Sequence, residues 1–245
     1  MKIVSRGIVA LVCLLWPAIA APRDQIPDKF TNLQVLPKDA SRADVVAVMR
    51  SFAGALGVRC NHCHIGENPA TLENFDFASD AKDTKKIARG MMRMTGEING
   101  RLVPAAGVAK PVEVRCITCH RGLTKPEQLL DILTRTAEQR SLAAAIDEYR
   151  DLRQKYYGRG GYDFGAPTLN MLAEGFARRK DVAAAIEVQE FNVKVNPDIA
   201  TSYGLLGDLY LAKGDRDAAR GAFERAVALD PSSAFFKKRL DDLRR

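Results

Sequence analysis

Histidine is scarce in this 245-residue chain: only His62, His64 and His120 occur, and all three lie in short cysteine-containing segments. An enzyme that depends on histidine chemistry elsewhere in the chain is therefore excluded. Aromatic residues are also few, at 7%. The apolar fraction of 47% and the charged fraction of 27% are ordinary for a globular protein. Collagen-like, wholly disordered and polytopic membrane proteins are excluded as well.

Long hydrophobic runs are lacking too. The N-terminal apolar run, residues 7–19, is shorter than the roughly 17–25 residues of a comfortable membrane span. It follows Lys2 and Arg6 and ends at Ala18-Ile19-Ala20, a pattern typical of a cleaved signal peptide. We therefore expect residues 1–20 to be removed and the mature chain to be periplasmic. A retained N-terminal anchor is the alternative.

Only five cysteines occur, and Cys13 falls within the predicted signal peptide. The other four lie in Cys60-Asn61-His62-Cys63-His64 and Cys116-Ile117-Thr118-Cys119-His120. Each segment contains C-x-x-C-H, the attachment signature of c-type haem. Two thiols at this spacing reach the two vinyl groups on one porphyrin edge, and the following histidine is held under the iron. We predict two haem c groups, attached through Cys60, Cys63, Cys116 and Cys119, with His64 and His120 as iron ligands.

Three other interpretations of the cysteines are a zinc site, a redox dithiol pair and two disulfides, the default in an oxidising compartment. None of them explains a histidine at the same position of both motifs, or Gly66 and Gly122 two residues beyond. His62 is interpreted as a bystander within the first loop.

Excess positive charge is confined to one part of the mature chain. Residues 21–126 contain 16 Lys and Arg against 11 Asp and Glu, whereas residues 127–245 contain 19 of each. Compensation of an anionic cofactor explains this distribution. A nucleic-acid partner is not expected, because the chain is exported and poor in aromatic residues.

The sixth iron ligand has to be sought among the methionines, because no histidine is left for both irons. Ser41-Arg42-Ala43-Asp44 predicts a capping box that opens a helix over residues 42–56. Met49 lies on the apolar stripe of this helix, before Cys60, and is our candidate for the first haem. The alternative is that Met49 is one more core residue.

A second helix is predicted over residues 81–99, ahead of the second motif. Met91 and Met94 share one face of it, and one of the two is expected to bind the second iron. The spacing alone does not separate them.

The chain resembles the cytochrome c subunit of photosynthetic reaction centres over residues 21–126. The resemblance rests on Leu36-Pro37-Lys38, Phe75-Asp76-Phe77-Ala78-Ser79-Asp80, Ala88-Arg89-Gly90-Met91-Met92-Arg93-Met94-Thr95 and the two attachment motifs. In that family a methionine on a helix upstream of the motif is the usual sixth ligand. The resemblance therefore implies Met49 for the first haem and Met91 for the second.

The C-terminal half repeats itself at a shift of 34, the tetratricopeptide period. Residues 142–157 resemble the second helix of an earlier, degenerate unit, and residues 232–245 predict a capping helix. Such arrays commonly bind a peptide or a protein. The alternative is that this short array only shields the haem domain or mediates oligomerisation. The matching positions are Leu169, Leu172, Ala173, Phe176, Ala185 and Pro197, which recur as Tyr203, Leu206, Gly207, Tyr210, Ala219 and Pro231.

These observations predict an all-α chain: a signal peptide (1–20), a compact dihaem cytochrome domain (21–126) and a tetratricopeptide-repeat α-solenoid (127–245). The expected function is periplasmic electron transfer without an enzymatic site, through redox partner proteins and association with a membrane complex. A dihaem peroxidase and a haem-bearing adaptor are the alternatives.

Overall fold

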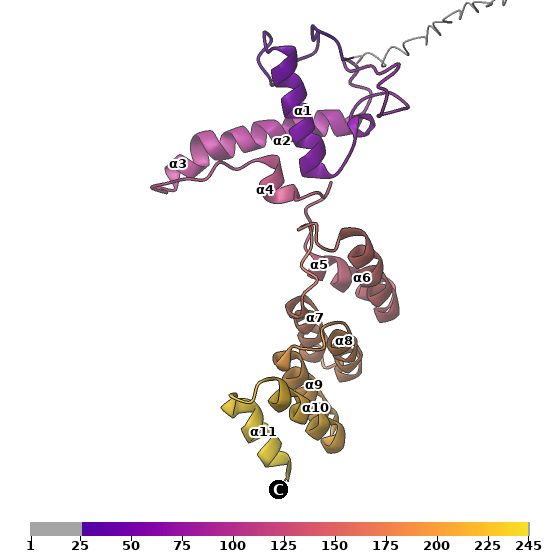
Figure 1. Cartoon of the computed structure of the whole chain (residues 1–245), viewed down its shortest axis with the longest axis vertical. Coiled ribbons are helices and arrows are strands. Elements are labelled where there is room, and N and C mark those ends of the chain that lie inside the picture. The colour runs from indigo at the N-terminus through magenta and orange to yellow at the C-terminus, as the bar shows by residue number, and fades with distance from the viewer. Residues whose placement is uncertain (1–25, 245) are drawn as a thin grey trace, which may run out of the picture. The chain divides into compact units, whose positions relative to one another are not determined.

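The computed structural model describes residues 26–244, so the predicted signal peptide lies outside the described residues (Figure 1). Within this range the chain is all α, as predicted: it has no β-strand, and Ile65 and Asp76 form one isolated bridge. None of the helices described there combines the length and apolar character that crossing a membrane requires.

The elements are α1 (Arg42–Leu56), η1 (Cys60–His62), α2 (Asp83–Glu97), η2 (Ile98–Leu102), α3 (Val103–Ala105), α4 (Cys116–His120), α5 (Leu129–Gln139), α6 (Leu142–Tyr156), α7 (Ala166–Arg178), α8 (Val182–Val195), α9 (Ala200–Lys213), α10 (Arg216–Leu229) and α11 (Ala234–Arg244).

The chain separates into two compact units. The first contains residues 26–47 and Arg59–Gly96, and the second contains Val48–Val58 and residues 97–244. The predicted boundary between residues 126 and 127 lies within the second unit and stays a prediction.

Helix α1 has the predicted bounds because local signals define both of its ends. At the start, the backbone N–H of Asp44 donates to Ser41 Oγ at 3.2 Å. At the end, the Gly57 N–H donates to the Gly54 carbonyl at 3.4 Å and the Val58 N–H to the Ala53 carbonyl at 3.0 Å. This pair of bonds is a Schellman motif, and Gly57 supplies the positive φ of +66° that it requires.

Helix α2 is shorter than the predicted stretch of residues 81–99. It runs from Asp83 to Glu97 and passes into a π-helical turn, η2. Asn99 lies in this turn, where its side-chain amide donates to the Val114 carbonyl and accepts from the Val114 N–H, both at 2.8 Å. Helical periodicity does not reveal such a turn, because the two bonds join residues 15 positions apart.

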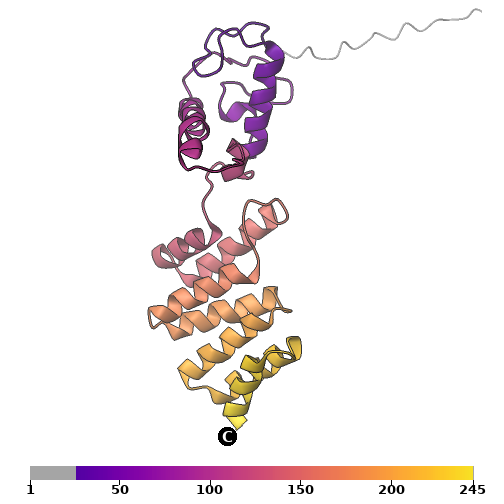
Figure 2. The same cartoon turned by 90° about the vertical axis from the view of Figure 1, so that its left-hand side faces the viewer.

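Helices α5 to α10 form three consecutive pairs that stack side by side, and α11 packs against α10 (Figure 2). The predicted capping helix is therefore confirmed as α11, and residues 142–156 form the second helix of the first pair. Ser141, Asp181 and Asp215 cap the second helix of each pair by accepting the backbone N–H three residues on, at 3.1, 3.1 and 3.0 Å. Asp181 and Asp215 are one repeat period apart.

A buried cluster of polar side chains joins the second and third pairs. Asn170 on α7 accepts hydrogen bonds through Oδ1 from Gln189 (2.8 Å), Asn192 (2.7 Å) and Ser202 (3.1 Å). Gln189 also donates to the Ser202 carbonyl at 2.7 Å. The three donating residues are fully buried. Because an unpaired buried polar group is costly, the cluster favours one arrangement of α7, α8 and α9.

Candidate haem-attachment sites

The two C-x-x-C-H motifs begin with the same backbone turn. The residue before each motif is extended, with φ −112° and ψ 173° at Arg59 and φ −116° and ψ 168° at Arg115. Each carbonyl then accepts the N–H three residues on, from His62 and from Thr118, at 2.9 Å in both cases. The motifs therefore present their side chains from one local geometry, although the first continues as a 3-10 turn and the second as an α-turn.

All four cysteines of the motifs carry free thiols. Burial raises the pKa of the Cys63 and Cys116 thiols above the ordinary value. Both pairs are thus available for addition to vinyl groups, and neither forms a disulfide in this structure.

His120 is buried and oriented for metal binding. Its Nδ1 lies 2.8 Å from the Leu123 carbonyl. A carbonyl only accepts hydrogen bonds, so Nδ1 carries the proton and the lone pair of the neutral ring is on Nε2. This is the common second contact of a metal-ligating histidine, which fixes the tautomer and the ring plane.

His64 is partly buried and flanked by the ring of Phe77, with 5.1 Å between the ring centroids. Its Nδ1 is buried and has no hydrogen-bond partner among residues 26–244. Burial, followed by the nearby charges of Lys85 and Lys82, lowers the pKa of His64 to about 4. The imidazole is therefore neutral at ordinary pH, as a metal ligand has to be.

These observations are what haem c requires of a protein: a pair of free thiols at each motif, a neutral imidazole at His64, and at His120 an imidazole whose ring is fixed through its second nitrogen. The residues present therefore fit the cofactor.

Two side chains at the start of α2 hold the first attachment loop. Lys82 donates through its ammonium to the Asn61 carbonyl, and Thr84 donates through Oγ1 to the His62 carbonyl at 2.7 Å. Our sequence reasoning missed both residues. Hydrogen bonds to backbone carbonyls impose no residue type on the partner, so the sequence carried no signal that could have identified them.

The loop that packs on His64 is fastened by two charged side chains of α2. Lys85 donates to the carbonyls of Phe77, Ala78 and Ser79 at 2.9, 3.0 and 2.8 Å, and forms an ion pair with Asp80 at 3.2 Å. Arg89 pairs with Asp80 at 2.8 Å. Residues 75–80 are one of the segments on which the family resemblance rests. In the structure this segment lies beside His64, through the contact of Phe77.

The charge of Asp80 stabilises this loop in a pH-dependent way. Hydrogen bonds from Arg89 and Asn32 hold the pKa of Asp80 well below its usual range. Stabilisation by such a carboxylate is complete above the unfolded-state pKa of about 3.9 and is lost as the pH falls below it. We expect Asp80→Asn to be less stable than the wild type at pH 7 in urea unfolding, and the difference to shrink between about pH 5 and pH 2.

The matched control is Asp198→Asn, at an exposed position before α9. It should give no pH-dependent difference from the wild type. A difference for Asp80→Asn that stays constant from pH 7 to pH 2 would contradict the assigned role.

Gly66 and Gly122 lie two residues beyond the histidines of the two motifs, and each position requires glycine for a different reason. At Gly66, a Cβ would lie 2.1 Å from the Phe75 ring. Gly122 has φ +88°, and its N–H donates to the Ala55 carbonyl at 2.8 Å. On the other side of this contact, a Cβ on Gly57 would lie 2.3 Å from the Gly122 carbonyl oxygen. The end of α1 and the second motif thus meet backbone to backbone.

The candidate methionine ligands are found on the predicted helices. Met49 lies on α1 with 36% of its surface exposed. On α2, Met91 is partly buried, whereas Met94 is 45% exposed. Met49 belongs to the second unit and His64 to the first, while Met91 belongs to the first and His120 to the second. Their pairing at the two irons stays a prediction.

Comparison with known proteins supports the sequence resemblance. Residues 14–157 match the family described as the photosynthetic reaction centre cytochrome c subunit, and residues 200–233 match the tetratricopeptide repeat. The reaction centre cytochrome c subunit of Rubrivivax gelatinosus is 32% identical over 120 residues, which cover 39% of this chain and 30% of that protein. Cytochrome c-554 of Chloroflexus aurantiacus is 34% identical over 92 residues, which cover 37% of this chain and 20% of that protein.

The chain thus spans less than a third of the length of either curated relative. Among solved structures, the first tetratricopeptide domain of human RPAP3 is similar, with 19% identity, a TM-score of 0.33, and coverage of 47% of this chain and 87% of that one. The match of the family to more than half of the sequence, including both attachment motifs, confirms the resemblance. The chain therefore belongs to the photosynthetic reaction centre cytochrome c subunit family, and it carries a tetratricopeptide repeat after the cytochrome region.

Proposed function

We propose that this chain is an exported, periplasmic cytochrome that carries two haem c groups and transfers electrons between protein partners. The hydrogen bond from His120 Nδ1 to the Leu123 carbonyl is the observation that carries the proposal, because it prepares Nε2 to bind a metal. The matching turns at Arg59 and Arg115 support a second, equivalent site. Export is inferred from the N-terminal sequence pattern.

The residues have distinct roles in this proposal. Cys60 and Cys63, and likewise Cys116 and Cys119, attach one haem each, and His64 and His120 bind the irons. Bound haem supplies a one-electron ferric–ferrous couple. Methionine as the second axial ligand, from Met49 and Met91, raises the potential relative to bis-histidine ligation.

The repeat region is proposed to dock a partner. Tetratricopeptide arrays expose extended helical surfaces, and partner binding is their common use. Docking through the repeats would leave the haem-bearing segments free to exchange electrons.

The proposal predicts reversible redox cycling of the purified full-length protein. Dithionite followed by ferricyanide should reduce and reoxidise all of the haem, and a pyridine haemochrome assay should give two haems per chain. Because a methionine is predicted at each sixth position, hydrogen peroxide turnover should stay at the level of a simple electron-transfer cytochrome.

Two results would contradict the proposal. One is a haem content of one or none per chain after expression with a cytochrome c maturation system. The other is rapid peroxide turnover with a saturable dependence on peroxide, which would favour the peroxidase alternative.

A further inference from the structure

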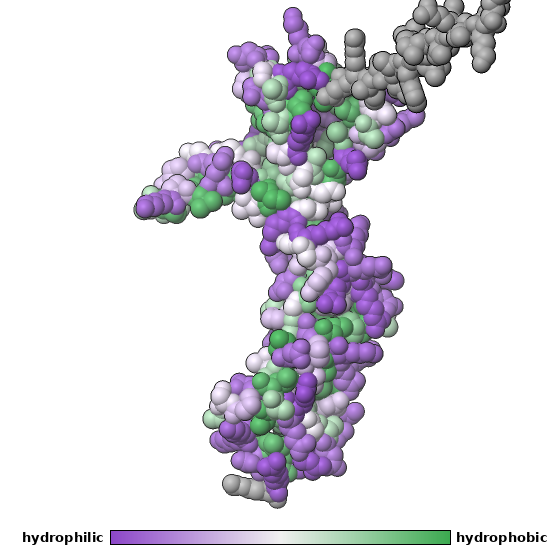
Figure 3. Space-filling model, viewed as in Figure 1, coloured by the Kyte–Doolittle hydropathy of each residue, from purple (hydrophilic) through white to green (hydrophobic). Residues whose placement is uncertain are grey.

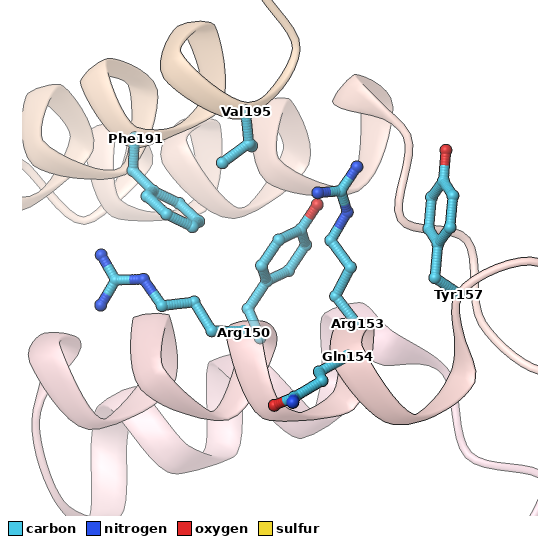
Figure 4. Close-up of a pocket in the computed structure, with 7 residues that line it drawn as sticks. Arg150, Arg153, Gln154, Tyr157, Phe191 and Val195 are labelled. Carbon is cyan, nitrogen blue, oxygen red and sulfur yellow. The ribbon is translucent and has the colours of Figure 1, made fainter.

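A pocket of about 450 Å³ opens between α6 and α8 in the repeat region. Figure 4 shows Arg153 extending from α6 toward α8, while Phe191 and Val195 point back from α8. Its size is within the range of about 300–1,000 Å³ that is typical of ligand-binding pockets. The lining residues are Tyr149, Arg150, Arg153, Gln154, Tyr157, Phe191 and Val195.

Arg153 is the feature of the pocket that points to a ligand. Its guanidinium stacks 4.6 Å from the ring centre of Tyr157. Its Nε is buried and has no hydrogen-bond partner among residues 26–244, and no carboxylate in that range forms an ion pair with it. A buried N–H without an acceptor is costly. The planar guanidinium of arginine also presents N–H groups as a fork that binds a carboxylate with two parallel bonds.

Arg150 adds a second cation to the same pocket. Its guanidinium lies 5.1 Å from the ring centre of Phe191 and pairs with Asp147 at 2.7 Å. The side chains of this pair are 58% and 70% exposed. An exposed ion pair one helical turn apart contributes little, so a carboxylate from outside can replace Asp147.

The lining of the pocket is cationic and aromatic. Its charged members are Arg150 and Arg153, and its aromatic members are Tyr149, Tyr157 and Phe191. Tyr157 is 64% exposed. On the face shown in Figure 3, the surface over α6 is mainly hydrophilic. Tyrosine and arginine are the residues enriched at the energetic centres of protein interfaces.

We propose that this pocket binds an acidic peptide segment of a protein partner. A carboxylate of the segment pairs with the guanidinium of Arg153, and an adjacent apolar side chain packs against Phe191 and Val195. A recessed pocket whose guanidiniums are held against aromatic rings suits one peptide better than a membrane surface, which would contact exposed cations over a broad, flat face. The inference rests on the docking role proposed for the repeat region.

The test is isothermal titration of the full-length haem-containing protein with a short peptide in which a leucine–phenylalanine pair is flanked by glutamates. Arg153→Gln should weaken binding about tenfold or more, which corresponds to about 1.4 kcal/mol. Arg153→Lys keeps the charge but loses the fork, and should recover only part of the affinity. Raised salt should weaken the binding of the wild type.

Arg225→Gln is the matched control, because Arg225 also stacks on a tyrosine, Tyr203 at 5.7 Å, but lies on α10 and does not line the pocket. It should change the affinity less than twofold. Far-ultraviolet circular dichroism and thermal unfolding establish that each variant is folded. The same peptide with glutamine in place of glutamate should not bind.

Three outcomes would overturn the proposal: no binding by the wild type at millimolar peptide, equal affinities for Arg153→Gln and Arg225→Gln, or Arg153-dependent binding to phosphatidylglycerol vesicles that the acidic peptide does not displace. The titration does not involve the haem potentials, so its failure is distinguishable from a failure of the electron-transfer proposal.

Discussion

Replacing Cys116 and Cys119 together with alanine is expected to halve the haem content of the protein. In the proposed function each motif supplies both thiols for one haem, and the two motifs share a backbone turn but no cysteine. Loss of one thiol pair should therefore remove one haem and leave the haem at Cys60 and Cys63 attached. The pyridine haemochrome assay, together with the mass of the intact chain under denaturing conditions, measures the result.

The fifth cysteine provides the control. Cys13 lies in the predicted signal peptide, so Cys13→Ser should leave the haem content of the mature protein unchanged. If the Cys116→Ala, Cys119→Ala protein still carries two covalently bound haems, the assignment of the second motif is wrong.

The second large effect is expected for Met49→Leu. Leucine has nearly the volume of methionine and stays apolar, so the substitution should cost less than roughly 1.5 kcal/mol of stability. It cannot bind iron. We expect both haems to stay attached, the long-wavelength charge-transfer band of thioether-ligated ferric haem to weaken, and one potential to fall by on the order of 0.1 V, within the ~0.8 V range that axial ligands span.

Potentiometric titration followed by visible spectroscopy measures this change. Met171→Leu, at a 45% exposed position on α7, is the control and should leave both potentials unchanged. Unchanged potentials and an unchanged band for Met49→Leu would show that Met49 does not bind the iron. The same comparison between Met91→Leu and Met94→Leu identifies the ligand of the second iron.

Sequence reasoning succeeded where the determining signals are local. Ser41 and Gly57 mark the two ends of α1 within a few residues of the helix itself, so its bounds were predicted correctly. The repeat region was predictable for a related reason. One packing unit recurs at a fixed period, and the caps at Asp181 and Asp215 recur with it.

Prediction from the sequence was less successful where two distant segments meet through their backbones. Lys85 binds three consecutive carbonyls, and Gly57 approaches the carbonyl of Gly122. Neither contact depends on the partner's side chain, so no pattern of residue types in the sequence predicts it. The candidate attachment residues follow from their spacing, and their role stays a prediction. The hydrogen bonds around the first motif, such as that from Thr84, became visible only in the structure.

The polar cluster around Asn170 limits how this repeat array can be rebuilt. Repeat proteins are often lengthened or shortened by exchanging single units, because each unit contacts only its neighbours through similar apolar surfaces. Here one amide oxygen serves donors on α8 and on α9, in two successive pairs of helices. Moving one pair of helices into another scaffold would leave buried amides without hydrogen-bond partners in both proteins. The four residues of the cluster would therefore have to be transferred together: Asn170, Gln189, Asn192 and Ser202.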